Sequence, residues 1–453
     1  MANAFTLPFD LTQLFAENRP RLAHMHDASA FAHDFATSVQ LSPDQSALLQ
    51  RTALLHDIGY APAIQHYKFH PLDGALFLEK YGEDPWVVEG VLRHSLAEHK
   101  AATLPHVAGL YAARPVIDAA QWLVQAVTIA DWRAAGVGGR VSFGQRLNDI
   151  ITRNPDNPGK AARATDMVSH VRRWFTTFMH IAFQATPLPW IFSDVDNTLI
   201  CPGQALSKRN AHSLRAYVLQ GGRFSLATGK HPDSIRALVE ELHLVDVPHI
   251  AVNGTCVLHN STIRLLAHLP EDATHLAQRL ESMGLPVVMY RTGGIETGCH
   301  WTDALSDLFE QYGEIRPVAS NQAGPLLKIL CIVKDDDARR EQDLRELADT
   351  FGVACCRSDA QFLEFLPKDG NKGLALRTIL QEAQWPLLHS IAVGDSENDA
   401  PMFAQCGMCA AVANASVSSL RGADWILPAC HESGMAELLD VIGKHGWAGI
   451  GNE

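Results

Sequence analysis

The spacing of apolar residues divides the chain into two regions. Across residues 1–186, apolar positions recur at helical intervals; in residues 46–58, for example, Leu48 and Leu55 share a helix face, and Gly59 ends the helix. From residue 189 onward, short apolar runs without polar alternation come between amphipathic stretches. Such runs suit buried parallel strands, and their alternation with helices builds a doubly wound sheet. The pattern predicts a multidomain protein, with an all-α region followed by an α/β region.

The order of elements in the second region indicates an insertion. The sequence predicts a first strand at 189–193, then helix 208–219, strand 223–227, helix 231–242 and strand 249–252. Residues 255–366 then mix helices with strands, which favours an inserted α+β cap. The predicted domains are an all-α domain at 1–186, an α/β core at 187–254 and 367–453, and the cap at 255–366.

Composition and charge exclude some classes of function. Of the 453 residues, 47% are hydrophobic and 19% charged, as in ordinary globular proteins, and the net charge is -13. This acidic surplus argues against coating a nucleic acid, whose phosphates attract clustered Lys and Arg. Apolar runs fall short of the roughly 20 residues that cross a membrane, and residues 1–20 do not resemble a signal peptide. Nine unevenly spaced cysteines are typical of reduced thiols, so we expect a cytoplasmic protein that binds neither nucleic acid polymers nor membranes.

Candidate chemistry gathers where the predicted strands of the second region end. Asp194 and Asp196 follow the first strand and point the same way, because side chains alternate along a strand. Beyond such strand ends, paired carboxylates can hold a divalent cation, or one can attack while the other moves protons. A turn rich in Asp and Asn is the competing interpretation. Three later stretches weigh against it, at residues 225–230, 370–373 and 391–399.

Together these four stretches resemble the four motifs of the haloacid dehalogenase (HAD) superfamily of phosphohydrolases. The large cap resembles its Cof-type, sugar-phosphatase-like branch, and the resemblance runs from residue 188 to the C-terminus with a Rossmann-like core. It implies that Asp194 attacks phosphorus to form an aspartyl-phosphate, while Asp196 acts first as acid and then as base. Thr228 would hydrogen-bond a phosphoryl oxygen, and Lys372 would balance its developing charge.

The same resemblance implies a Mg²⁺ ion at this site. Its ligands would be the carboxylates of Asp194 and Asp395 and the backbone carbonyl of Asp196, an oxygen-only set that suits Mg²⁺. Asp399 is expected to orient Lys372 or a metal-bound water. Further contacts with substrate or with these side chains are expected from Thr198, Gly229, Lys230, Asn253 and Asn398, and from the cap by Arg291, Thr297, Gly298 and Lys328.

A second set of candidate residues lies in the helical region. His56 and Asp57 end an apolar helix, unlike the other His–Asp pairs of the chain, at 26–27 and 33–34. Asp131 ends a later helix on its apolar face, and a buried carboxylate needs a partner such as a metal or a histidine. Other histidines that accompany this set are His24, His70 and His94.

This pattern resembles the HD phosphohydrolase superfamily over residues 21–148. The resemblance implies one divalent transition metal, such as Mn²⁺, Fe²⁺, Co²⁺, Ni²⁺ or Zn²⁺, bound by His24, His56, Asp57 and Asp131. His70 and His94 fall where relatives hold a second metal or contact phosphate. Many relatives carry Lys where Tyr60 stands here, so that phosphate contact is either lost or made by Lys68 or Arg93.

The two resemblances predict a bifunctional, metal-dependent phosphohydrolase. The HAD half would hydrolyse a small phosphate monoester such as a sugar phosphate, and the HD half a phosphate ester or nucleotide. In the alternative hypothesis, the HD half is a non-catalytic, ligand-binding regulatory module. Transfer of phosphate to an acceptor other than water is a third hypothesis, although nothing in the sequence marks an acceptor pocket. The expected partner in each case is a small phosphorylated substrate.

Overall fold

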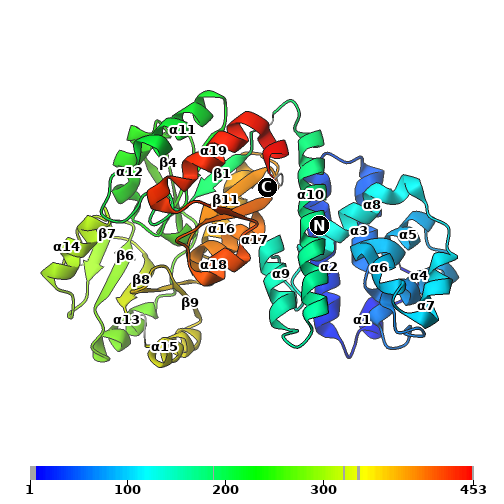
Figure 1. Ribbon diagram of the computed structural model, residues 1–453. Coiled ribbons are helices and arrows are strands. Elements are labelled where there is room, and N and C mark those ends of the chain that lie inside the picture. The colour runs from blue at the N-terminus through cyan, green and yellow to red at the C-terminus, as the bar shows by residue number, and fades with distance from the viewer. Residues whose placement is uncertain (1–6, 187, 320–321, 334–336, 451–453) are drawn as a thin grey trace. The chain divides into compact units, whose positions relative to one another are not determined.

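The computed structural model describes residues 7–186, 188–319, 322–333 and 337–450. Two compact units divide the chain, one with residues 1–187 and 450–453 and the other with residues 188–449 (Figure 1). The predicted fold class, an all-α region followed by an α/β region, is confirmed. None of the described helices is long and apolar enough to span a membrane.

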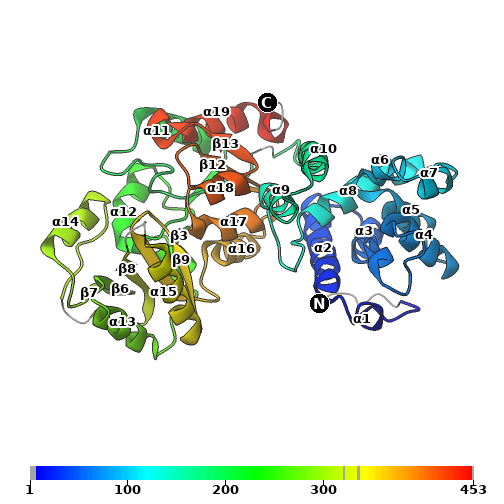
Figure 2. The same cartoon turned by 60° about the horizontal axis from the view of Figure 1, so that its bottom comes forward.

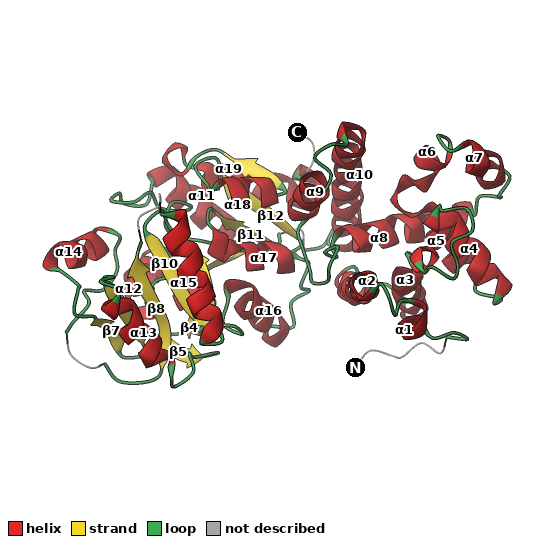
Figure 3. Cartoon of the chain, turned by 90° about the horizontal axis from the view of Figure 1, so that it is seen from below, coloured by secondary structure: helices red, strands yellow, loops and turns green. Residues whose placement is uncertain are grey.

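The N-terminal unit is built of helices joined by loops (Figure 3). Polar caps begin several of them: Asn18 accepts a hydrogen bond at the start of α2, and Ser42 forms a capping box at the start of α3. Their apolar faces meet in a core that includes Phe15, Leu55 and Val91. The helices are α1 (Leu11–Leu14), α2 (Arg19–Ser38), α3 (Pro43–Leu55), α4 (His70–Lys80), α5 (Pro85–Arg93), α6 (Ala97–Ala101), α7 (Pro105–Ala112), α8 (Gln121–Trp132), α9 (Phe143–Thr152) and α10 (Pro158–Ala182).

The C-terminal unit contains a parallel core sheet with the strand order β13-β12-β11-β1-β2. Its strands are β1 (Trp190–Ser193), β2 (Arg223–Leu226), β11 (Ser390–Gly394), β12 (Met408–Val412) and β13 (Trp425–Leu427). All residues of β1 are buried, as its apolar sequence predicts. Because β1 pairs in parallel with both β2 and β11, the carboxyl ends of these strands meet at one edge of the sheet.

Helices cover both faces of the core sheet. Apolar side chains of α16 and α17 pack against β1 and β11, whereas α11 and α19 pack together and contact β2 and β13 (Figures 1 and 2). The helices of this unit are α11 (Lys208–Leu219), α12 (Pro232–Glu241), α13 (Ala273–Ser282), α14 (Asp303–Gln311), α15 (Ala338–Thr350), α16 (Lys372–Glu382), α17 (Ala400–Gln405), α18 (Val417–Gly422) and α19 (Gly434–His445).

A second sheet, with the order β7-β6-β8-β10-β9, is antiparallel and lies between β3 and α16 in the sequence. Its strands are β6 (Val287–Arg291), β7 (Gly294–Thr297), β8 (Leu326–Ile332), β9 (Val353–Arg357) and β10 (Phe362–Pro367). Helices α13 and α15 pack on it through buried side chains such as Leu276, Leu280 and Leu344 (Figure 2). This α+β layer is the inserted cap.

The strand after α12 pairs differently from the expectation. It was predicted as another strand of the parallel sheet, but β3 (His249–Ala251) joins that sheet only through a parallel bridge between Ala227 and Ile250. Its ladder is antiparallel, with β4 (Cys256–His259), which continues to β5 (Thr262–Leu265). The reason is that β4 and β5 follow directly and fold back as local antiparallel neighbours.

One expectation about the cysteines is wrong. Cys201 and Cys430 form a disulfide, with their Cα atoms 5.7 Å apart, whereas reduced thiols were predicted throughout. The two residues are 229 positions apart in the sequence. Only the fold brings the loop after β1 next to the turn before α19, so no local spacing of cysteines marks the pair.

Candidate active sites

The first cluster, here called the carboxylate site, lies where the central strands of the core sheet end. Asp194 follows β1 and Asp395 follows β11, and the register of these parallel strands brings both carboxylates to one edge. Lys372 is the first residue of α16, whose N-terminus is capped by Asn371. Its fully buried Nζ lies 2.7 Å from Oδ1 of Asp194 and 2.7 Å from Oδ1 of Asp399. One buried cation therefore joins carboxylates that follow different strands.

Hydrogen bonds hold the carboxylates of Asp395 and Asp399 in place. Thr198 Oγ1 donates to Oδ1 of Asp395 (3.1 Å), and Ser396 Oγ donates to its Oδ2 (2.9 Å). Oδ2 of Asp399 accepts from the backbone N–H groups of Asp395 (2.9 Å) and Ser396 (3.1 Å). A Cβ at Gly394 would lie 2.3 Å from the Asp399 side chain, so this approach requires glycine.

Crowding of these carboxylates changes their acidity. Burial, together with Asp399 and Asp196, raises the pKa of Asp194 to about 7, although Lys372 acts in the opposite direction. Burial and the nearby Asp194 also raise the pKa of Asp395 well above its usual range. Carboxylate oxygens of Asp194, Asp395 and Asp399 lie within 4.8 Å of one another. A divalent cation would relieve this repulsion, and the all-oxygen donor set fits Mg²⁺.

Asp196 lies at the rim of the carboxylate site, with 30% of its side chain exposed. Nζ of Lys230 lies 2.6 and 2.7 Å from its two carboxylate oxygens and also donates to the backbone carbonyl of Tyr312 in the cap. Oγ1 of the buried Thr228 accepts a hydrogen bond from the backbone N–H of Lys230 (3.1 Å). Lys230, for which a substrate contact was expected, thus holds the candidate acid and base.

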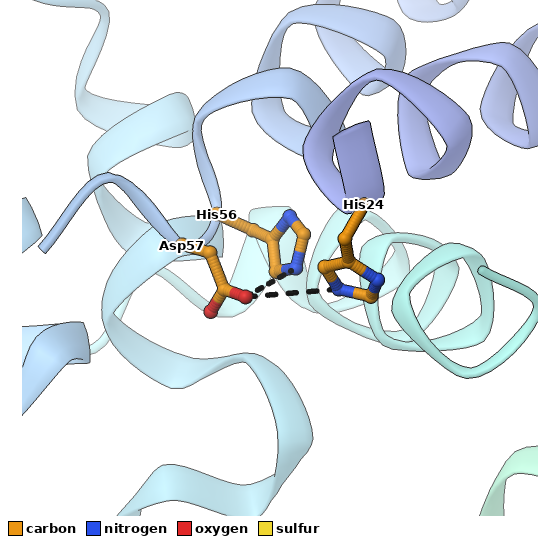
Figure 4. Close-up of side chains that lie close together, drawn as sticks. All are labelled: His24, His56 and Asp57. Atoms are coloured by element: carbon orange, nitrogen blue, oxygen red, sulfur yellow. Dashed lines mark ion pairs between the residues drawn. The ribbon is translucent and has the colours of Figure 1, made fainter. Parts of the chain in front are cut away.

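The second cluster, here called the histidine site, gathers side chains from several helices of the N-terminal unit. His24 comes from α2, His56 directly follows α3, and Asp57 comes next, all of them buried (Figure 4). Nε2 of His24 and Nε2 of His56 lie 3.6 and 3.4 Å from Oδ2 of Asp57. The same nitrogens lie 3.2 and 3.8 Å from Oδ1 of Asp131 in α8. The four residues predicted as metal ligands therefore converge.

Backbone carbonyls determine which ring nitrogens face this centre. Nδ1 of His24 lies 3.0 Å from the carbonyl oxygen of Ala135, and Nδ1 of His56 lies 2.7 Å from that of Ala53. A carbonyl only accepts, so each Nδ1 carries the proton and leaves Nε2 free to bind a metal. Within the described part of the chain, neither Nε2 has a hydrogen-bond partner. Such buried nitrogens beside two carboxylates fit a transition metal.

Charge interactions in the histidine site favour the ionised forms. Burial lowers the pKa of His56, but the negative charges of the neighbouring Asp57 and Asp131 outweigh it and raise that pKa to about 10. Burial raises the pKa values of Asp57 and Asp131, yet His56 and other basic neighbours bring both well below their usual range. Because a metal binds the neutral imidazole, protonation of His56 would compete with metal binding at this site.

His70 and His94 adjoin the other carboxylate oxygen of Asp57. Their Nε2 atoms lie 3.2 and 3.9 Å from Oδ1 of Asp57 and 3.3 Å from each other. Burial lowers the pKa of His70 to about 3 and also lowers that of His94, so both rings favour the neutral form that binds metals. Asp57 thus belongs to two groups of potential metal ligands, one with His24 and one with His70.

Comparisons with known proteins agree with both geometries. Residues 191–439, more than half of the chain, match the haloacid dehalogenase-like hydrolase family. The chain belongs to this HAD family. Residues 21–135 match the HD domain, so an HD domain precedes the HAD unit.

Relatives of the HAD unit include phosphatases. The 5-amino-6-(5-phospho-D-ribitylamino)uracil phosphatase YwtE of Bacillus subtilis is 24% identical over 55% of this chain and 96% of its own length. An HMP-PP phosphatase of Cronobacter sakazakii is 27% identical over 49% of this chain and 83% of its own. A haloacid dehalogenase-like hydrolase of known structure from Bacteroides thetaiotaomicron is 25% identical, with a TM-score of 0.50, and the match covers 56% of this chain and 99% of that one.

A pocket with about 70 Å³ of space for water extends from the carboxylate site into the cap of the HAD unit. Its cap side carries aromatic rings that sequence reasoning did not single out, and Phe362 makes edge contacts with Phe309 and Tyr312 at 5.7 and 5.6 Å between ring centroids. Tyr290 also lines the pocket and donates to Glu314, whose pKa is raised by burial. Phe309 lies in α14 and Phe362 in β10, and the apolar pattern of neither element shows that these rings line a pocket.

A buried ion pair forms part of the lining of this pocket. Lys328, one of the cap residues expected to reach substrate, pairs with Glu364 at 2.8 Å and donates to the carbonyl oxygen of Gly229 at 2.7 Å. Asn253 donates to the same Glu364, and Asn398 donates to Oδ1 of Asn253 (3.1 Å). These predicted residues therefore join the cap to the second and fourth HAD motifs.

The other cap residues expected to reach substrate lie elsewhere. Arg291 pairs with Glu296 at 3.0 Å and with the carbonyl oxygen of Gly324. Gly298 is packed against Glu281, which a Cβ at this glycine would approach to 2.1 Å. Of the described residues, Lys328 is the one from that expected group that lines the pocket.

Two arginines of the HD domain contact the predicted metal ligands, although neither was expected to. Arg21 Nη1 lies 2.6 Å from Oδ2 of Asp57, and Arg146 Nη2 lies 3.3 Å from Oδ1 of Asp131. Arg93, expected as one substitute for the missing lysine, instead pairs with Glu89 at 2.6 Å. The sequence could have predicted this contact for Arg21, because Arg21 precedes His24 by three residues and therefore lies on the same helix face.

Proposed function

We propose that this protein is a two-site phosphohydrolase, with a phosphomonoesterase in the HAD unit and a separate metal-dependent site in the HD domain. The observation that carries the first half is the placement of Lys372 between Asp194 and Asp399 at the carboxyl ends of the core strands. This arrangement combines a carboxylate nucleophile with a buried cation beside the position where phosphoryl charge develops.

The proposed reaction at the carboxylate site has two steps. An oxygen of Asp194 forms a bond to phosphorus as the bond to the ester oxygen breaks, and Asp196 gives its proton to that leaving oxygen. Asp196 then takes a proton from water as the water oxygen attacks phosphorus and releases Asp194. Lys372 and Thr228 stabilise the phosphoryl oxygens through charge and hydrogen bonding.

Asp194 and Asp395 would hold a Mg²⁺ ion, with the backbone carbonyl of Asp196 as a further ligand. Magnesium would supply charge neutralisation for the phosphoryl group. Asp399 would orient Lys372, since it accepts from both that lysine and the backbone that carries Asp395. Lys230 would position Asp196, with which it is already paired.

The cap pocket suggests which monoester is hydrolysed. Its aromatic rings suit the flat or apolar face of a leaving group, and the Lys328–Glu364 pair supplies polar contacts close to Gly229. One relative is a phosphatase of 5-amino-6-(5-phospho-D-ribitylamino)uracil, which carries a uracil ring and a phosphorylated sugar alcohol. We therefore propose a small phosphate monoester, either a sugar phosphate or one that carries a heteroaromatic ring.

The histidine site would act without a covalent intermediate, because its carboxylates are committed to basic partners. His24, His56, Asp57 and Asp131 would hold a divalent transition metal, which would supply Lewis-acid chemistry for hydrolysis of a phosphate ester or nucleotide. His70 and His94 would bind a second ion or the substrate. In the competing proposal, the same residues bind a ligand that regulates the HAD unit.

The test is phosphate release from a panel of sugar phosphates, nucleotides and heteroaromatic phosphates, measured with Mg²⁺ and with Mn²⁺. We expect Asp194→Asn to lower turnover of one group of substrates by roughly a thousandfold or more, and Asp57→Ala to abolish another. The exposed Asp369 provides a control, Asp369→Asn, that should change neither. If Asp57→Ala removes no activity, the regulatory proposal replaces the catalytic one; if Asp194→Asn changes nothing, the HAD mechanism is wrong.

A further inference from the structure

The pocket of the HAD unit has an acidic lining. If Asp194 attacks phosphorus, the leaving group of the ester lies in this pocket, because Asp194 and Asp196 both line it. The charged residues of the lining are Asp194, Asp196, Glu314, Asp359 and Glu364, with Lys230 and Lys328. Acidic groups therefore outnumber basic groups around the space that the leaving group occupies.

The two lysines of the lining do not neutralise this excess. Nζ of Lys230 lies 2.6 and 2.7 Å from the two carboxylate oxygens of Asp196. Nζ of Lys328 lies 2.8 Å from a carboxylate oxygen of Glu364. Each lysine is thus committed to an acid of the same lining, and a negatively charged leaving group would have to compete with that acid for it.

The remaining acids of the lining are Glu314 and Asp359, both in the cap, and within the described part of the chain neither forms an ion pair. Glu314 is 8% exposed and accepts from neutral donors such as the hydroxyl of Tyr290 (3.1 Å). Asp359 lies in the loop between β9 and β10, where Asn197 Nδ2 donates to its Oδ2 (3.3 Å). Burial raises the pKa of both carboxyl groups, and the charge of Asp196 adds to the rise at Asp359. Both carboxylates therefore lack the paired cation that would offset their burial.

Aromatic rings complete the same lining. Phe309, Tyr312 and Phe362 face the pocket beside these carboxylates. An ammonium group already lies against a further ring of the lining, since Nζ of Lys328 is 4.0 Å from the centre of the Tyr290 ring. Aromatic faces attract cations, and a ring together with a carboxylate suits a bound ammonium group. The pocket therefore offers its leaving group the surroundings that a cation needs.

We propose that the HAD unit hydrolyses phosphate monoesters whose leaving group carries an ammonium group, as in an amino sugar phosphate or an amino alcohol phosphate, and that Asp359 binds this group. The inference rests on the proposed phosphomonoesterase function and narrows its substrate class. Asp359 is placed for this role because Asn197, its hydrogen-bond donor, directly follows Asp196, the candidate acid and base. A leaving group with a second phosphate or a carboxylate meets negative charge instead and is rejected.

The experiment measures kcat/KM of the full-length protein with Mg²⁺ for esters that differ in one charge. Glucosamine 6-phosphate and phosphoethanolamine carry an ammonium group where glucose 6-phosphate and ethylene glycol phosphate carry a hydroxyl, and 6-phosphogluconate carries a carboxylate. We expect at least one ammonium ester to exceed its hydroxyl partner roughly tenfold or more, as a hydrogen bond between charged groups predicts. The carboxylate ester should be hydrolysed most slowly.

Variants of Asp359 separate recognition from a structural role. Asp359→Asn can still accept from Asn197, but it should bring kcat/KM of the ammonium ester down to that of its hydroxyl partner. Asp359→Lys should reverse the order and favour 6-phosphogluconate. These ratios compare two esters in one variant, so a smaller folded fraction does not change them. The exposed Asp349 of the cap helix α15 provides the control Asp349→Asn, which should keep the wild-type preference.

The outcomes distinguish this inference from the proposed function. If Asp194→Asn abolishes hydrolysis but wild type prefers neither ammonium ester, the inference is overturned and the phosphomonoesterase stands. It is also overturned if Asp359→Asn keeps the preference, or if Asp349→Asn loses it equally. If Asp194→Asn leaves hydrolysis unchanged, the proposed function fails, and the inference fails with it.

Discussion

The two candidate sites balance charge in opposite ways. In the carboxylate site, acidic groups outnumber bases: burial and mutual repulsion raise the pKa values of Asp194 and Asp395, with Lys372 as the shared cation. In the histidine site, bases outnumber acids: the pKa values of Asp57 and Asp131 fall well below their usual range. Both sites contain buried aspartates, but the neighbouring groups shift the pKa values of those aspartates in opposite directions.

This difference indicates what each site needs in order to bind phosphate. The carboxylate site needs a cation before a phosphate dianion can approach Asp194, which suits an oxygen-loving ion such as Mg²⁺. Asp194 shares the single cation Lys372 with Asp399, and in the ionised form that a bound cation favours, its carboxylate is the nucleophile. The aspartates of the histidine site are strongly ionised and held by basic partners, so they suit metal ligation rather than attack on phosphorus.

The largest expected effect comes from removing the single shared cation. Lys372→Met should lower the kcat/KM of the HAD reaction roughly a thousandfold, because Asp194 and Asp399 lose their shared cation and phosphoryl charge is not balanced. Metal binding by the HD domain should stay unchanged. The exposed Lys368 provides the control Lys368→Met. Steady-state kinetics beside a Mn²⁺ content assay test this comparison, and retention of a tenth of the activity would refute the role of Lys372.

Many of the helices and strands could be predicted from the sequence, because they depend on local residue patterns. The predicted helix at 208–219 coincides with α11, and the apolar runs before Asp194 and Asp395 form the neighbouring strands β1 and β11. In the histidine site, His24, His56, Asp57 and Asp131 converge as the family resemblance implied. Helix periodicity and short buried strands are set by neighbours in the chain, which is why sequence alone reveals them.

What escaped prediction depends on contacts between distant segments. The pairing of β3 with β4 competes with the parallel sheet, and hydrophobicity alone does not decide between these partners. Arg146 reaches Asp131 from the next helix; its segment resembles that of small-molecule HD relatives, but the sequence does not show which carboxylate it meets. The aromatic rings of the cap pocket, such as Phe362, carry the same alternation as core residues. Sequence patterns show that a side chain is apolar or charged, but not which surface it meets.

The opposite behaviour of buried histidines offers a second test, with a smaller effect. His56 beside carboxylates has a raised pKa, whereas burial lowers the pKa of His249 in the HAD unit to about 4. His249 accepts from the backbone N–H of Leu226 and faces the carbonyl of Leu244, so it stays neutral when folded. The unfolded chain takes up a proton near pH 6.5, so the stability that His249 contributes is complete above that pH and is lost as pH falls toward 4.

This linkage predicts that the HAD unit loses about 2 kcal/mol of stability between pH 7.5 and pH 5 through His249 alone. Urea unfolding followed by tryptophan fluorescence measures it, and His249→Gln should remove that part of the pH dependence. The exposed His275 on α13 serves as the control, because His275→Gln should leave the pH dependence intact. An unchanged pH dependence in His249→Gln would show that this histidine is not kept neutral by burial.

The smallest expected effect concerns selectivity, and it separates the two sites by their ligands. Phe362→Leu removes a ring that contacts Phe309 and Tyr312 in the cap pocket but leaves the carboxylate site untouched. Such ring contacts are worth about 0.5–1.5 kcal/mol, so KM for a heteroaromatic phosphate should rise up to about tenfold with little change in kcat. KM for a small sugar phosphate should rise less, because a sugar offers no aromatic face. Steady-state kinetics on both substrates test this prediction. Equal rises in KM would mean that Phe362 shapes the pocket without selecting the leaving group. Phosphate binding by the HD domain should stay unchanged.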